Sequence, residues 1–393
     1  MYNGVMYSRL LQVNHDNSFF LFGPRGVGKS SWVRSSYPEA IYFDLLHHRT
    51  QRELLADPSR LQERIPTLHQ DWIIIDEIQK CPSLLDEVHR GIEQKGQKFI
   101  LTGSSARKLR QDGVNLLAGR AFTHHMHTLT PHEIAEEFDL IRALQRGLLP
   151  KAYQECTYED FLQSYVQTYI KEEVAQEALT RNLDNFYRFL EAISFSQGSV
   201  LNITSVARDC SVHRKVVENY IGILEDLLIA SRLQPFTKKS KRRLCQSPKF
   251  YFFDVGVYRA IRPSGPLDQP EEIEGISLET LVYQVLRAWC EYANQKNQLF
   301  YWRSASGQEV DFIIYGQCGI IALEVKRSNR YSPRDLSGLK AFLSDYPGAR
   351  AYFLYMGEET RYLQENLTVI PIVEFLRQEL NWVTVRETVQ EAR

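Results

Sequence analysis

The chain has 393 residues, 44% of them hydrophobic, so it can build more than one hydrophobic core. Its formal net charge of −1 excludes a basic field over the whole molecule, so any nucleic-acid surface must be local. Six cysteines without a C-x-x-C pair argue against a zinc ribbon and a disulfide framework. No apolar run reaches the length of a membrane span and no signal-peptide core is recognised, so we expect a cytoplasmic protein without a membrane partner.

A phosphate-binding loop is expected directly after the first strand. Apolar residues 19–22 run into Gly-x-x-x-x-Gly-Lys-Ser, and a helix-compatible stretch follows. Glycines let backbone N–H groups surround phosphates, Lys29 reaches the β and γ oxygens, and Ser30 offers a hydroxyl to Mg²⁺. The residues expected to contact ATP are Gly23, Pro24, Arg25, Gly26, Val27, Gly28, Lys29, Ser30, Ser31 and Ser104.

An acidic pair follows a second apolar strand at residues 72–75. We expect Asp76 to hold Mg²⁺ together with Ser30, and Glu77 to polarise the water that attacks the γ-phosphate. The alternative is a buried strand whose end carries ordinary charged residues. Because the pair comes after a phosphate-binding loop, the combination indicates ATP hydrolysis and not binding alone.

Further strands are predicted at 41–44, 99–101 and 121–129, and they alternate with helical stretches such as 84–92. This alternation predicts an α/β fold with a mostly parallel sheet covered on both faces. Ligands of such sheets bind at the carboxyl ends of the strands, where Ser104 or Thr102 could sense the γ-phosphate. The same Thr-Gly-Ser-Ser segment also reads as a simple turn.

Two arginines are candidates for a finger that stabilises transition-state charge in a neighbouring subunit. Arg120 follows a small-residue turn before the last strand of the core, and Arg107 follows the Ser-Ser turn. Either could be an ordinary surface arginine. We prefer Arg120, which with Lys29 and Glu77 completes the expected catalytic set.

The middle of the chain is predicted to be helical. Thr130-Pro131 marks a helix start, and residues 130–184 form an expected helical lid or connector. Residues 185–236 have the pattern of a winged helix, in which Arg214 and Lys215 begin the second helix of a helix-turn-helix. Such units also pack on ATPase cores or mediate assembly, without DNA contact.

A basic cluster follows at 238–243. Clusters of this kind bind phosphate backbones by releasing counterions, although a solvated loop has the same composition. The expected nucleic-acid contacts are Arg214, Lys215, Lys238, Lys239, Lys241, Arg242 and Arg243.

A second set of acidic residues lies near the C-terminus. Glu279 falls in an amphipathic helix, while Asp311 and the Glu324-x-Lys326 motif fall on two strands of an expected hairpin. Carboxylates so placed can hold Mg²⁺ beside an ammonium that helps activate water. The pattern resembles the PD-(D/E)xK nuclease fold, and structural hairpins with these residues are also common.

The motifs taken together resemble bacterial and archaeal AAA-type ATPases of the archaeal-ATPase-like branch. The N-terminal resemblance rests on residues 23–30, 75–79, 101–105 and 117–120. Residues 249–256, Glu279, 301–303 and 309–312 are similar to the domain of unknown function that follows the ATPase in that family. Residues 147–150 stand where relatives tend to carry paired glycines. The resemblance implies an ATPase joined to a winged helix and a nuclease-like domain.

We therefore expect a P-loop ATPase core at 1–129, a helical lid or connector at 130–184, a winged helix at 185–236 and a restriction-endonuclease-like α/β domain at 237–393. The predicted function is a Mg²⁺-dependent ATPase that acts on DNA. The expected partners are ATP, DNA and further copies of the chain. The alternatives are a nucleotide-dependent switch that regulates a protein partner and an ATP-regulated DNA nuclease.

Overall fold

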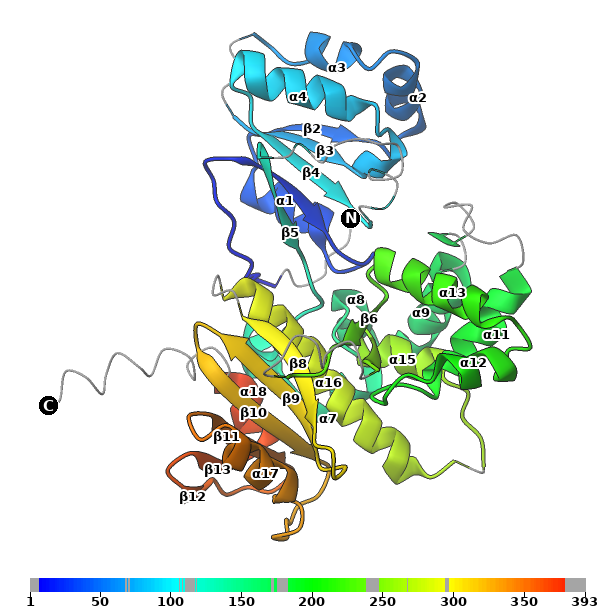
Figure 1. The fold of residues 1–393 in the computed structure, drawn as a ribbon. Coiled ribbons are helices and arrows are strands. Elements are labelled where there is room, and N and C mark those ends of the chain that lie inside the picture. Colours follow the sequence, from blue (N-terminus) through cyan, green and yellow to red (C-terminus); the bar gives the residue numbers. More distant parts are fainter. Residues whose placement is uncertain are drawn as a thin grey trace, which may run out of the picture. The chain divides into compact units, whose positions relative to one another are not determined.

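The computed structural model describes residues 7–67, 69, 71–105, 107, 109, 117, 119–170, 173–174, 183–237, 247–266, 268–293 and 297–378 (Figure 1). The chain divides into two compact units. The N-terminal unit comprises Leu11–His127 and Gly222–Ile229, and the C-terminal unit comprises Met1–Leu10, Thr128–Ile221 and Ala230–Arg393. None of the helices in the described ranges is long and apolar enough to cross a membrane.

A five-stranded parallel sheet forms the centre of the N-terminal unit, in the order β2-β3-β4-β1-β5. The strands are β1 (Ser18–Phe22), β2 (Ile41–Asp44), β3 (Ile73–Asp76), β4 (Phe99–Gly103) and β5 (Ala121–His125). The helices are α1 (Lys29–Ser36), α2 (His48–Ala56), α3 (Arg60–Glu63), the 3₁₀ turn η1 (Ile78–Lys80) and α4 (Leu84–Lys95). The predicted parallel α/β sheet is therefore confirmed, and its last strand ends at His125 instead of Leu129.

The core of this unit forms because its strands are apolar on both faces, as is usual for parallel strands covered by helices. Strands β1, β3 and β4 are buried along their whole length. Helix α4 has its apolar residues at helical spacing and buries Leu84, Leu85 and Val88 in the same cluster. Leu228, from the distant segment 222–229, also packs against this cluster.

The C-terminal unit begins with helices. They are α6 (Pro131–Ile134), the 3₁₀ turn η2 (Ala135–Glu137), α7 (Leu140–Arg146), α8 (Pro150–Gln154), α9 (Tyr158–Ser164), a π-helix η3 (Tyr165–Ile170) and α11 (Leu183–Ser194). The predicted helix start at Thr130 is confirmed, because Thr130 and Glu133 form a reciprocal capping box with Pro131 in the first turn. Helix α7 packs against α15 (Val255–Ile261) and α16 (Pro270–Tyr292), so this helical region belongs to the C-terminal unit.

Three helices and a hairpin follow one another between residues 183 and 252. Helix α11 contacts α12 (Ile203–Asp209), which a turn joins to α13 (Arg214–Asp226). Strands β6 (Ala230–Leu233) and β7 (Lys249–Phe252) then pair in antiparallel fashion. The predicted basic cluster at 238–243 lies between these two strands and outside the described residues.

A six-stranded mixed sheet, in the order β12-β13-β11-β10-β9-β8, completes the C-terminal unit. Its elements are β8 (Gln298–Arg303), β9 (Glu309–Gly316), β10 (Gly319–Lys326), α17 (Ser337–Asp345), β11 (Arg350–Tyr355), β12 (Arg361–Gln364), β13 (Leu367–Pro371) and α18 (Ile372–Gln378). Strands β9 and β10 form the antiparallel hairpin that the sequence predicted, and helix α16, which carries Glu279, packs on both.

Candidate functional site

The phosphate-loop motif lies between β1 and α1 of the N-terminal unit. Gly26 and Gly28 have φ of 83° and 98°, a region that residues with a Cβ seldom adopt. At Gly23 a Cβ would lie 2.4 Å from the backbone oxygen of Met126. The loop backbone therefore requires glycine at these positions, and Gly28 directly precedes the first turn of α1.

Lys29 is the buried cation of this loop. Lys29 is only 6% exposed, and its Nζ donates to the backbone oxygens of Gly23 at 2.6 Å and Pro24 at 3.1 Å. The loop carbonyls thus hold the ammonium over the N-terminus of α1, where the helix dipole also favours an anion. Of the other expected ATP contacts, Pro24 and Val27 are buried, while Arg25 and Ser31 are exposed.

Asp76 is the centre of a hydroxyl network at the end of β3. It is 2% exposed, and its Oδ1 accepts from Ser30 Oγ at 3.1 Å. Thr102 Oγ1 also donates to Oδ1, and the Tyr42 hydroxyl donates to Oδ2. Strand β4 lies between β1 and β3, so it brings Thr102 between the phosphate loop and Asp76. A serine hydroxyl facing an aspartate is the oxygen pair that holds Mg²⁺ in P-loop proteins, so the residues fit this ion.

Glu77 directly follows β3 in a left-handed conformation with φ of 63°. Such a conformation in a residue with a Cβ costs about 1–3 kcal/mol and persists where the surroundings determine it. The Glu77 N–H donates to Thr102 Oγ1 at 3.2 Å. The Gln79 amide donates to the Glu77 carboxylate and, at 3.1 Å, to Ser104 Oγ. Gln79 therefore connects the expected base to the expected γ-phosphate sensor.

Tyr42 and Gln79 were not predicted as site residues. Tyr42 reaches Asp76 because β2 pairs with β3 in the register that places Asp44 opposite Asp76. Gln79 is 7% exposed and lies in the turn that follows Glu77. Its place in the motif at 75–79, two positions after the expected base, is a sequence signal for it.

The two candidate arginines lie at opposite ends of the parallel strands. Arg120 comes just before β5, whose first residue pairs with Ser18 at the start of β1. Arg120 therefore lies at the amino end of β5, and the phosphate loop lies at the carboxyl end of the neighbouring strand. The length of the five-residue strand, roughly 16 Å at about 3.3 Å per residue, separates the two ends. Arg120 forms an ion pair with Glu93. Arg107, on the loop side of β4, pairs with Asp226 at 2.5 Å.

The predicted acidic residues of the C-terminal unit come together around a lysine that was not assigned to the site. Lys249 Nζ lies 2.6 Å from Glu309 Oε1, 3.3 Å from Glu279 Oε1 and 3.7 Å from Asp311 Oδ1. Glu324 lies near this group because β10 pairs with β9 in a register that places Leu323 opposite Phe312, the residue after Asp311. Lys326, the lysine of the predicted motif, is exposed. Lys249 and Tyr251 alternate along β7, a pattern that could have shown that they share one face.

Burial changes the proton affinities in this cluster. It raises the pKa of Asp311 to about 7, with a further contribution from the Glu279 charge and opposition from Lys249. Burial and the neighbouring Asp311 raise the pKa of Glu324 well above its usual range. Burial alone would lower the pKa of Lys249, but the surrounding carboxylates outweigh it and raise this pKa. The cluster thus stabilises a charged lysine.

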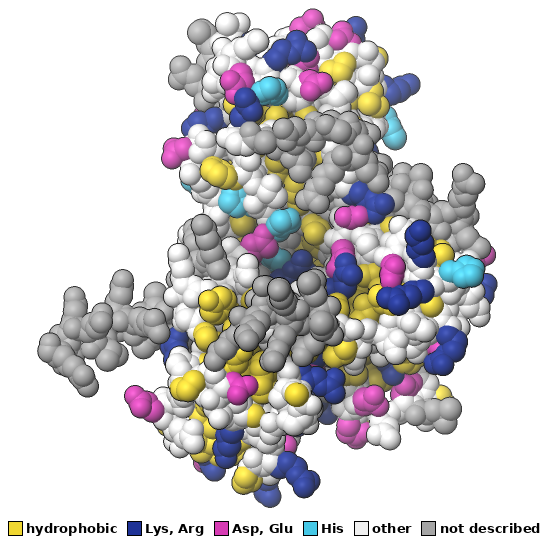
Figure 2. Space-filling model, in the orientation of Figure 1, with side chains coloured by type: hydrophobic (Ala, Val, Ile, Leu, Met, Phe, Trp, Pro, Cys, Tyr) yellow, Lys and Arg dark blue, Asp and Glu magenta, His cyan; other side chains and the backbone are white. Residues whose placement is uncertain are grey.

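The candidate nucleic-acid residues are divided between described and undescribed parts of the chain. Arg214 and Lys215 are exposed in the first turn of α13, and Arg214 forms an ion pair with Glu218 at 3.0 Å. Lys238, Lys239, Lys241, Arg242 and Arg243 lie outside the described residues. On the face shown in Figure 2, Lys and Arg side chains lie on the surface of the helices α11–α13.

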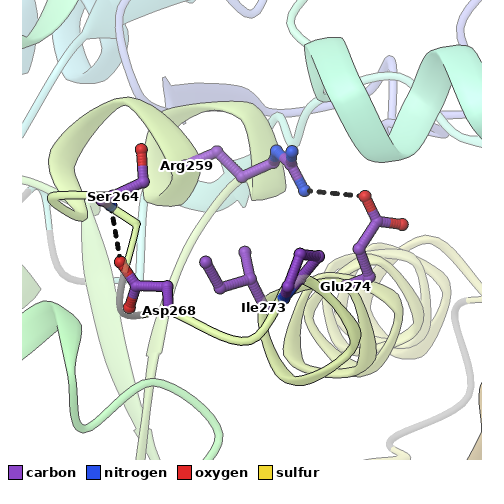
Figure 3. A pocket seen from close by; sticks show the side chains of 7 residues that line it. Arg259, Ser264, Asp268, Ile273 and Glu274 are labelled. Atoms are coloured by element: carbon purple, nitrogen blue, oxygen red, sulfur yellow. Dashed lines mark hydrogen bonds and ion pairs between the residues drawn. The ribbon is translucent and has the colours of Figure 1, made fainter.

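A small pocket of about 320 Å³ lies between the end of α15 and the start of α16 (Figure 3). Its charged side chains are paired: Arg259 lies 3.8 Å from Glu274, and Asp268 accepts from the Gly265 N–H at 2.7 Å and from Arg262 at 2.9 Å. Each charged side chain that lines the pocket thus already has an oppositely charged partner among the described residues.

Comparisons with known proteins agree with the N-terminal geometry. Residues 15–135 match a family model described as an AAA domain. Residues 137–268 and 274–375 match two models that are described only as domains of unknown function. Uncharacterized proteins of Mycobacterium tuberculosis and Mycobacterium bovis are each 25% identical over 367 residues, covering 91% of this chain and 80% of theirs.

Two of the solved structures that match are distant in sequence. The Bacillus subtilis DNA clamp loader delta protein is 13% identical with a TM-score of 0.25, covering 69% of this chain and 95% of its own. Protein VC1899 from Vibrio cholerae is 11% identical with a TM-score of 0.21, covering 95% of this chain and 97% of its own. The family model and the phosphate-loop geometry together support an AAA-type ATPase assignment for the N-terminal unit.

Proposed function

We propose that this protein is a Mg²⁺-dependent ATP hydrolase that couples hydrolysis to DNA binding or remodelling. The observation that carries the hydrolase part is the grouping of Lys29, the Ser30–Asp76 pair and Glu77 at one edge of a parallel sheet. An ATP-binding protein without hydrolysis would need the first of these groups but not a carboxylate held in a left-handed turn beside it.

Each residue has a distinct role in the proposed reaction. Lys29 binds the β- and γ-phosphate oxygens, while Ser30 and Asp76 would hold Mg²⁺, which neutralises charge on those oxygens. Glu77 accepts a proton from the water that attacks the γ-phosphate. Thr102 keeps both acids in place, since its hydroxyl donates to Asp76 and accepts from the Glu77 N–H. Tyr42 fixes the second oxygen of Asp76.

The proposed enzyme works as an oligomer in which Arg120 acts on the site of a neighbouring subunit. Support comes from its place in the sheet: it lies at the edge opposite the phosphate loop, so it cannot reach the ATP of its own subunit. Its side chain is 39% exposed and forms a surface-type ion pair with Glu93, an interaction that contributes little to stability. Arg107, paired with Asp226, is the less suited of the two.

Mixing two inactive variants tests this arrangement. Arg120→Ala should lower ATP turnover by about 10³-fold or more, since a finger contributes at least that much. Glu77→Gln should be inactive for a different reason. Mixed oligomers would pair an intact Glu77 site with an intact Arg120 from the next subunit, so the mixture should regain turnover. Arg60→Ala, which removes an exposed arginine from α3, is the control. Normal turnover of Arg120→Ala, or a mixture that stays inactive, would rule out the finger.

DNA is the proposed partner because two basic features fall within one helix-and-hairpin segment of the sequence. Helices α12 and α13 are joined by a short turn in which Ser211 has φ of 55°, and Arg214 and Lys215 begin the second helix. Strands β6 and β7 follow as a hairpin, and the basic cluster at 238–243 connects them in the sequence. A winged helix has the same order of elements, helices followed by a hairpin. The second helix of its helix-turn-helix, here α13, is the one that enters the DNA groove.

The salt dependence of DNA binding tests this part. Replacing Lys238, Lys239, Lys241, Arg242 and Arg243 with glutamine should weaken duplex binding and reduce the slope of log affinity against log salt by about 4.5, which is roughly 0.9 for each phosphate contact. Arg49→Gln with Arg52→Gln, both on α2 of the N-terminal unit, is the matched control. Duplex DNA should also raise wild-type ATP turnover. If neither binding nor stimulation occurs at low salt, the partner is not DNA, and a nucleotide-dependent switch on a protein partner becomes the better hypothesis.

A further inference from the structure

The ammonium of Lys249 lies among three carboxylates inside the C-terminal unit. The lysine side chain is 3% exposed, while those of Asp311, Glu279 and Glu309 are 14%, 20% and 33% exposed. All three carboxylates have an oxygen within 3.7 Å of Nζ. They come from α16 and β9, and the lysine comes from β7, so the cluster joins three elements that are distant in the sequence.

Two of the carboxylates around this ammonium have other partners as well. Glu279 Oε1 accepts from the Tyr251 hydroxyl at 2.5 Å, and Asp311 Oδ2 accepts from the Val325 N–H at 2.9 Å. A divalent cation needs several oxygens that point at one position within about 2.0–2.6 Å. Here that position is taken by Nζ. Within the described ranges, no group of three or more Asp, Glu, His or Cys side chains could hold a metal ion.

The three carboxylates keep Lys249 charged, and the charge of its ammonium opposes the binding of a second cation. A buried ammonium is unfavourable unless it is paired, and three surrounding carboxylates supply the pairing. A divalent ion at the same place would be repelled by Nζ at short range in a poorly screened interior. To bind, it would have to displace a side chain that is anchored on β7 by pairing with β6.

We propose that the Lys249 ammonium is the permanent cation of this acidic cluster. Glu279, Asp311 and Glu309 then serve to bind β7 to α16 and β9, and the residues do not fit a catalytic Mg²⁺ ion. The C-terminal unit is accordingly a module that does not cleave phosphodiesters. This inference goes beyond the proposed ATPase function and does not depend on it, because it concerns a different unit.

A competing arrangement uses the same residues. Lys249 could be an activating lysine beside a metal that Asp311 and Glu324 bind, since one buried oxygen of Glu324 has no hydrogen-bond partner among the described residues. The two arrangements differ in one measurable property. In the competing one the wild-type protein binds a divalent ion that depends on Asp311, and in the proposed one it does not.

Mn²⁺ binding to the full chain without nucleotide, followed by electron paramagnetic resonance, separates the two. Wild type and Asp311→Asn should bind Mn²⁺ equally, because any ion at the phosphate loop does not involve Asp311. Lys249→Ala should gain a Mn²⁺ site that binds at least tenfold more tightly than any site of the wild-type C-terminal unit. Asp311→Asn in the Lys249→Ala background should remove this site. Lys326→Ala, which removes the exposed lysine, should bind as wild type does.

Two results would overturn the proposal: a wild-type Mn²⁺ site that Asp311→Asn weakens tenfold or more, or a folded Lys249→Ala protein that gains no site. The first comparison needs no change at Lys249, so it decides the question even if that variant does not fold. DNA cleavage gives an independent result. Linear and branched DNA with Mg²⁺ or Mn²⁺ should stay uncut, and cutting that Asp311→Ala abolishes would also overturn the proposal. ATP turnover enters none of these measurements.

Discussion

Replacing Glu77 with glutamine is expected to lower the ATP turnover number by about 10²- to 10⁴-fold while nucleotide affinity stays at the wild-type level. The amide has the shape of the carboxylate but cannot accept the proton of the attacking water. Nucleotide binding should persist because Lys29 and the loop glycines are untouched. Steady-state phosphate release and the affinity for a fluorescent ATP analogue measure the two quantities separately.

Two further variants make this result specific. Glu63→Gln removes an exposed carboxylate from α3 of the same unit and should leave turnover unchanged. Lys29→Ala should instead weaken nucleotide binding by about ten- to hundredfold, the contribution of charge-assisted hydrogen bonds. Full turnover by Glu77→Gln would show that Glu77 is not the base, whereas loss of nucleotide affinity would show that it supports the binding loop.

The N-terminal site could be predicted in large part because its signals are local. A buried strand that ends in a glycine-rich loop fixes where phosphates bind, and a buried strand that ends in two acids supplies the carboxylates. Parallel strands present their carboxyl ends at one edge of the sheet, so the meeting of Ser30 and Asp76 at 3.1 Å follows from the topology. This step needed no knowledge of side-chain contacts.

The residues that the sequence did not reveal depend on register and on long-range packing. Tyr42 contacts Asp76 only because β2 pairs with β3 in one particular register. Lys249 meets Glu279 and Asp311 only when a hairpin, a helix and a second hairpin pack together. Segment 222–229 is continuous with the predicted winged helix and yet packs in the N-terminal unit. Periodicity within one element carries no information on any of these contacts.

The largest expected loss of stability comes from Gly147, which directly follows α7. Gly147 ends α7 with φ of 73° and ψ of −169°, a combination that is essentially limited to glycine. A Cβ there would lie 2.1 Å from Asp254 Oδ1. Gly147→Ala should therefore lower the free energy of unfolding of the C-terminal unit by about 3 kcal/mol or more.

Asp254 cannot move aside to relieve this clash, since it is completely buried and holds four hydrogen bonds. Its oxygens accept from the backbone N–H groups of Leu148, Gly256 and Val257 at 2.7, 2.9 and 3.1 Å, and from the Gln284 amide at 3.3 Å. The alanine would either break this set or force the backbone of α7 away from α15. Burial raises the pKa of Asp254, and these four donors oppose that rise, so the set lowers the cost of burying the carboxylate.

Calorimetric unfolding of the full chain measures the effect, and a loss of about 3 kcal/mol should lower the midpoint of the C-terminal unit by roughly 6 °C or more. Gly275→Ala in α16 is the matched control, because no heavy atom lies within 4 Å of its Cβ position and alanine favours a helix. Nucleotide affinity should be unchanged in Gly147→Ala, since the phosphate loop belongs to the other unit. If the Gly147→Ala protein has the same unfolding midpoint as wild type, the contact between Gly147 and Asp254 does not constrain the fold. Loss of nucleotide binding as well would mean that the two units do not fold independently of one another.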